Sequence, residues 1–117
     1  MSLKTCYEAL GGNYDEALGR LMSERIMQKF VLKFLNEGSY DLLMSALDAK
    51  DGDAAFRAAH TLKGVASNLG MTLLQHEASE MTEALRGKDI EAAKSLMPRF
   101  DEVCGKTISA LGELLEE

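Results

Sequence analysis

The chain is expected to be an all-α protein, because apolar residues recur at helical spacing along it and strand-type alternation is absent. Apolar residues make up 46% of the sequence, with one proline and no tryptophan, which is typical of a folded helical protein. Its 117 residues suffice for one hydrophobic core, and no linker or repeat divides them. Residues 1–117 are therefore expected to form a single domain.

Three helices are expected in the first half of the chain. The first begins behind Asn13, which forms a capping box with Glu16. The second begins behind Ser23 and ends near Asn36, and the third is capped by Ser39. The residues expected to face inward are Tyr14, Ala17, Leu18, Leu21, Met27, Phe30, Val31, Phe34, Leu43, Ala46 and Leu47.

Three longer helices are expected in the second half. Asp53 is expected to cap the first, which ends at Gly70, and Asp89 is expected to cap the last. The intervening helix ends near Gly87. Pro98 is expected to kink or break the long last helix early. The inward residues of the last two helices are Leu74, Ala78, Met81, Leu85, Ala93, Met97, Phe100, Cys104, Thr107, Leu111 and Leu114.

Short connections between long amphipathic helices favour antiparallel neighbours. The expected assembly is an antiparallel up-down-up-down four-helix bundle, with a short amino-terminal helix that covers one end and a long carboxy-terminal helix. The methionines and aromatic residues within the apolar stripes are interpreted as core packing and not as a cofactor site.

Charge and composition exclude several classes of function. A net charge of −6 disfavours binding to nucleic acid, where neutralisation of phosphates supplies most of the affinity. Cys6 and Cys104 lie far apart in the sequence, so they are expected to be reduced structural thiols without zinc or a disulfide. No apolar run approaches membrane-spanning length or resembles a signal peptide. The protein is therefore expected to be cytoplasmic and free of membrane contact. It is also expected to be a monomer.

The most informative segment is AHTLKGVASNLG, residues 59–70. At about 100° per residue, an apolar arc forms on one side of the predicted helix, and His60 points almost directly away from it. The side chains at i+3, i+4 and i+7 from His60 belong to Lys63, Gly64 and Ser67. The residues in the apolar arc are Ala55, Ala58, Ala59, Leu62, Val65, Ala66 and Leu69.

This segment resembles the signature of histidine phosphotransfer (HPt) domains, in which His-x-Leu-Lys-Gly is followed by a second glycine. His60, Leu62, Lys63, Gly64 and Gly70 match that pattern. The resemblance implies reversible transfer of a phosphoryl group between an aspartate of a response-regulator receiver domain and His60. It also implies that this chain is a phosphoryl carrier and not an enzyme. The receiver or a histidine or hybrid kinase would catalyse transfer, and the receiver would supply Mg²⁺, so no cofactor is expected here.

The residue types suit this chemistry. A neutral imidazole is a nucleophile toward phosphorus, and histidine, with an ordinary pKa near 6.5, is available in that form. A cation at Lys63 pairs with phosphoryl oxygens. Glycine inside a helix costs about 0.5–1 kcal/mol relative to alanine, so Gly64 indicates that a partner must approach closely.

Other residues are candidates for supporting roles. Arg57 and Lys63 form a basic spot that suits an acidic receiver pocket, and Phe56 is a candidate docking contact. Many HPt domains carry a glutamine on the next helix that hydrogen-bonds the active imidazole. The corresponding position here is Thr82, whose shorter side chain leaves Ser79 or Gln75 as substitutes, directly or through water. His76 has no Lys-Gly after it and is interpreted as an ordinary surface residue.

Alternative functions are less well supported. A di-iron bundle needs inward Glu-x-x-His pairs, and neither histidine has a glutamate three residues before it. A complete histidine kinase needs an ATP-binding domain, for which the chain is too short. The serious alternative is an HPt-like adaptor that binds a signalling partner without carrying phosphate, although the presence of both His60 and Lys63 favours the phosphorylated form.

Overall fold

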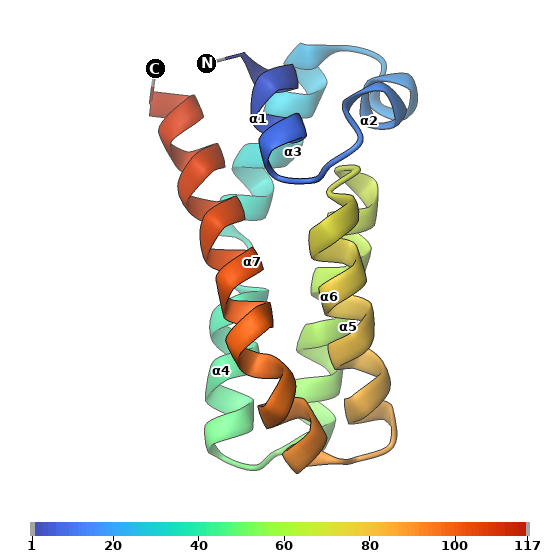
Figure 1. Cartoon of the computed structure of the whole chain (residues 1–117), viewed down its shortest axis with the longest axis vertical. Helices are drawn as coiled ribbons and strands as arrows, with labels where there is room; N and C mark the ends of the chain where they lie inside the picture. Colours follow the sequence, from blue (N-terminus) through green and yellow to red (C-terminus); the bar gives the residue numbers. More distant parts are fainter. Residues whose placement is uncertain (1, 117) are drawn as a thin grey trace.

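The computed structural model describes residues 2–116, and these residues form seven helices and no strand. This confirms the all-α prediction. Figure 1 shows the helices, which are α1 (Leu3–Ala9), α2 (Tyr14–Leu21), α3 (Glu24–Asn36), α4 (Ser39–Asp48), α5 (Gly52–Asn68), α6 (Thr72–Arg86) and α7 (Ile90–Glu116).

Three of the predicted helix starts are confirmed by side-chain caps. In each case the capping oxygen accepts a hydrogen bond from the backbone N–H three residues later, which satisfies one of the unpaired donors of the first turn. These caps are Asn13 for α2 at 3.0 Å, Ser23 for α3 at 3.2 Å and Asp89 for α7 at 2.9 Å.

Two predicted caps are wrong. Asp51, not Asp53, caps α5, and its carboxylate accepts from the Ala54 N–H at 3.1 Å. Asp53 lies in the first turn of the helix instead. The Gly38-Ser39 pair does mark the start of α4, but Gly38 is the cap and Ser39 is the first helical residue, whose N–H donates to the Glu37 carboxylate at 3.0 Å.

The sequence interpretation missed α1. Ser2 caps this helix by accepting from the Thr5 N–H at 3.1 Å. Leu3, Cys6 and Tyr7 are buried. A helix this short is not stable by itself in water, so its periodicity is a weak signal and its stability comes from packing.

Of the two outcomes predicted for Pro98, a kink or a break, the break is wrong. Helix α7 continues through this exposed residue. An internal proline costs roughly 3 kcal/mol. The helix buries Ala93 before Pro98, and Phe100 and Val103 after it, so continuing in one helix keeps both apolar segments in the core.

Helices α4 to α7 lie side by side along the long axis of the molecule, and α3 continues above α4 in Figure 1. Helices α1 and α2 cover the end at which both termini lie. Polar contacts also link α7 to its neighbours, because the Arg99 guanidinium pairs with the buried Glu77 carboxylate of α6. The Tyr40 hydroxyl of α4 donates to Asp101 at 2.5 Å, and this bond raises the pKa of Tyr40 to about 12.

None of the helices within residues 2–116 is both long enough and apolar enough to cross a membrane.

Candidate functional site

The predicted orientation of α5 is confirmed. Six of the seven residues in the predicted apolar arc are buried, and Val65 is half-buried at its edge. His60 is exposed. Burial of one stripe against α4 and α6 therefore turns the imidazole to solvent, where a partner can reach it.

The turn after α5 is held by the amino-terminal segment. The Tyr7 hydroxyl donates to the Leu69 carbonyl at 2.6 Å, and the Asn13 N–H donates to the Gly70 carbonyl at 2.7 Å. Gly70 has a φ of +69°, and a Cβ there would lie 2.9 Å from the Ala17 Cβ. Only glycine fits this turn, which sets how α6 packs beside the histidine helix.

Lys63 and Gly64 lie one turn after His60, as the sequence predicts. Lys63 is half-buried. The Lys63 ammonium forms no ion pair within residues 2–116 and is therefore available to an incoming anion. Gly64 is exposed, and a Cβ there would meet no atom within 4 Å.

An aromatic ring lies on the other side of His60. The Phe56 and His60 ring centroids are 5.9 Å apart, with an interplanar angle of 37°. The Arg86 guanidinium carbon of α6 lies 5.1 Å from the Phe56 centroid. Arg86 also pairs with Glu83 at 3.3 Å. The sequence interpretation missed Arg86, since nothing on α6 marks which of its residues face Phe56. Only the antiparallel pairing of α5 and α6 could have suggested it.

The remaining candidate side chains differ in burial and in their polar contacts. Arg57 is exposed and forms no ion pair within residues 2–116, whereas Ser67, Gln75 and Ser79 are half-buried. Thr82 is fully buried, and its hydroxyl donates to the Ala78 carbonyl of its own helix at 2.6 Å. Among the described residues, no side chain hydrogen-bonds the His60 ring.

The second histidine has a different environment. His76 lies on the exposed side of α6, with its Nε2 3.5 Å from a Glu80 carboxylate oxygen. None of the ring pairs in the described part of the chain involves His76. This agrees with the interpretation of His76 as an ordinary surface residue.

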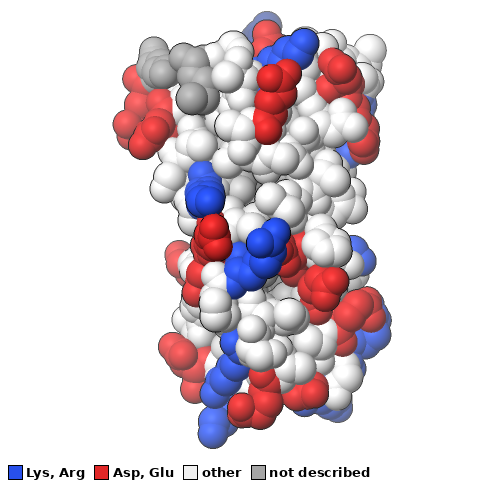
Figure 2. All heavy atoms as spheres, viewed as in Figure 1, with Lys and Arg blue, Asp and Glu red and all other residues white. Residues whose placement is uncertain are grey.

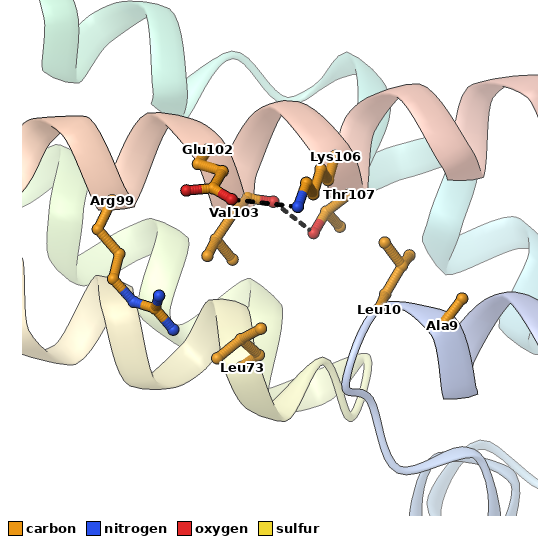
Figure 3. A pocket seen from close by; sticks show the side chains of 8 residues that line it. All are labelled: Ala9, Leu10, Leu73, Arg99, Glu102, Val103, Lys106 and Thr107. Atoms are coloured by element: carbon orange, nitrogen blue, oxygen red, sulfur yellow. Dashed lines mark hydrogen bonds and ion pairs between the residues drawn. The ribbon is translucent and has the colours of Figure 1, made fainter.

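A separate hollow lies between α1, α6 and α7, and Figure 3 shows its lining side chains. The cations here are neutralised, because Lys106 pairs with Glu102 at 3.1 Å and Arg99 pairs with Glu77. Acidic and basic side chains are likewise interspersed over the face in Figure 2. Arg57 and Lys63 differ from these neutralised cations, because they form no ion pair within residues 2–116 and lie on the same helix as His60.

Residues 2–116 contain no group of three or more His, Cys, Asp or Glu side chains placed to hold a metal ion. Cys6 and Cys104 are buried and form no disulfide. Burial raises the pKa of the Cys104 thiol to about 12, so this group is a protonated core residue.

Of three comparisons with known proteins, one found a match, and it includes the segment that carries the site. Searches of curated proteins and of solved structures gave no match. The model of the family described as "Hpt domain" matches residues 33–117, which include α4 to α7 and the whole histidine segment. Because this match covers most of the chain, the protein belongs to the Hpt domain family.

Proposed function

We propose that the protein is a phosphorelay intermediate that carries a phosphoryl group on His60. The observation that carries this proposal is the exposed imidazole with an unpaired Lys63 ammonium and the open surface of Gly64 one turn away. Membership in the Hpt domain family supports histidine phosphotransfer as the activity. In this proposal α3 to α7 serve as an antiparallel bundle that presents α5 to the partner.

In the forward step, a neutral nitrogen of His60 attacks the phosphorus of an aspartyl phosphate on a receiver domain. The N–P bond forms as the aspartyl O–P bond breaks, and the receiver carboxylate leaves. The reverse step passes the group to a second receiver. Lys63 pairs with the phosphoryl oxygens, while the receiver supplies Mg²⁺ and the other catalytic groups. The positive charges of Lys63 and Arg57 complement an acidic receiver pocket.

The test uses receiver domains encoded in the same genome, each charged with labelled phosphate and mixed with the whole chain. We expect at least one receiver to transfer an acid-labile, base-stable label to the wild type. His60→Gln should abolish labelling, and His76→Gln is the matched control that should retain it. Label that persists in His60→Gln would contradict the assignment.

The same experiment separates the carrier from a non-phosphorylated adaptor. An adaptor would bind one of the receivers, measured by titration calorimetry, without accepting label from any of them. Binding without labelling would therefore replace the carrier proposal with the adaptor function.

A further inference from the structure

The His60 ring has an aromatic neighbour in place of a hydrogen-bond partner. Phe56 precedes it by four residues, which places the two side chains on one face of α5. Their centroid separation of 5.9 Å falls within the range of attractive aromatic pairs. Thr82, the expected hydrogen-bonding position, uses its hydroxyl within α6. Phe56 is therefore the side chain whose contact with the imidazole the described structure shows.

Phe56 is in turn held by a second helix. The ring is half-buried, and the Arg86 guanidinium carbon lies 5.1 Å from its centroid, within cation–π range. Arg86 also forms an exposed ion pair with Glu83. The phenyl ring thus contacts the imidazole of its own helix and a cation from α6, so its orientation depends on the packing of both helices.

We propose that Phe56 is a positioning residue for the phosphotransfer reaction and that Arg86 acts through it. Phe56 restricts the rotation of the His60 side chain and leaves the side next to Lys63 and Gly64 open for the phosphoryl group. This role rests on the proposed function of His60 as the phosphoryl acceptor. It differs from a docking role, in which Phe56 would contact the receiver and leave the imidazole unaffected.

The expected decrease in transfer rate on loss of the Phe56 ring follows from the number of side-chain rotamers of His60. A histidine on a helix has two common χ1 wells and a broad, roughly two-fold χ2, which gives about four orientations. Restriction to the productive one raises its population by up to about fourfold. Loss of the ring should therefore lower the maximal transfer rate by about two- to fourfold while the half-saturating concentration changes little.

The kinetic test compares the wild type, Phe56→Leu and Phe56→Tyr with a phosphorylated receiver that labels the wild type. Leucine keeps an apolar side chain without a ring, and tyrosine restores the ring. We expect Phe56→Leu to lower the maximal rate and Phe56→Tyr to recover it. An unchanged maximal rate, or a rise in the half-saturating concentration alone, would overturn the positioning role and indicate docking.

A second measurement does not depend on phosphate transfer. In the unphosphorylated protein, the ring current of Phe56 should displace the imidazole proton resonances of His60 relative to those of His76, whose neighbour is Glu80. The displacement should disappear in Phe56→Leu and return in Phe56→Tyr. If it is absent from the wild type, the proposal fails. If it is present while no receiver labels the wild type, the imidazole is positioned and the carrier function is what has failed.

Variants of α6 test whether Arg86 acts through the ring. Arg86→Gln should lower the maximal rate, and Glu83→Gln, which removes the ion pair and leaves the cation, is the matched control that should not. The double variant Phe56→Leu/Arg86→Gln should be no slower than Phe56→Leu alone. A further loss in the double variant would show that Arg86 acts on the phosphoryl group independently of Phe56.

Discussion

Substitution of Gly64 should move stability and phosphotransfer in opposite directions. Gly64 lies inside α5, is exposed, and has open space where a Cβ would be. Alanine there should stabilise the protein by about 0.5–1 kcal/mol, because it loses less conformational entropy on folding. For a chain of this length, that gain raises Tm by about 2–5 °C. Calorimetric unfolding measures both quantities.

The functional half of the prediction uses a larger side chain. Glutamine is a good helix former, so Gly64→Gln should remain folded. Its Cβ would lie about 5–6 Å from that of His60, and the side chain would fill the space through which the phosphoryl group approaches. Misplacement of reacting groups by about 1 Å can cost roughly 10²-fold in rate, and a loss of that order is expected in transfer from a phosphorylated receiver.

Gly105 provides the matched control. It is also an exposed glycine inside a helix, α7, with no atom within 4 Å of a built Cβ. Gly105→Ala should raise Tm by a similar amount, and Gly105→Gln should transfer at the wild-type rate. A lower Tm for Gly64→Ala would show that Gly64 serves internal packing. Wild-type transfer by Gly64→Gln would refute the steric argument.

Two further predictions concern residues near the same helix. Lys63→Ala should slow phosphotransfer by about tenfold, because it removes a cation from the phosphoryl group, and should change the free energy of unfolding by at most about 1 kcal/mol. The control is Lys94→Ala, which changes an exposed lysine of α7. Equal phosphotransfer rates for the two variants would show that Lys63 acts only as a surface charge. Gly70→Ala should destabilise the fold by at least about 2 kcal/mol in urea unfolding, since φ is +69° and the new Cβ would clash with Ala17. Unchanged stability would mean that the turn relaxes freely.

The helix boundaries show which structural features can be predicted from residues that are close in sequence. Asn13, Ser23 and Asp89 are confirmed as caps because each acts on an N–H three residues away in the same segment. Between Asp51 and Asp53 the residue type alone does not discriminate, and the turn after α4 selects Asp51. The continuation of α7 through its proline likewise depends on the core that the helix covers on both sides.

The burial of the site residues also depends partly on their own helix and partly on the neighbouring helices. The exposed position of His60 follows from the apolar arc of its own helix and was predicted correctly. Lys63 lies at the edge of that arc, where the neighbouring helices decide how much of its stem is covered. Thr82 is buried in α6, and its place in the apolar stripe was not recognised because a threonine is compatible with either face.

Periodicity and short motifs were thus enough to establish an all-α chain with His60 facing solvent and Lys63 and Gly64 beside it, because these properties depend on residues within a few positions of one another in one helix. The contact of Arg86 with Phe56 belongs to tertiary packing, as does the docking of α1 on the turn after α5. Apolar burial drives that packing without directional preference, so the register between helices emerges only when the whole core is assembled.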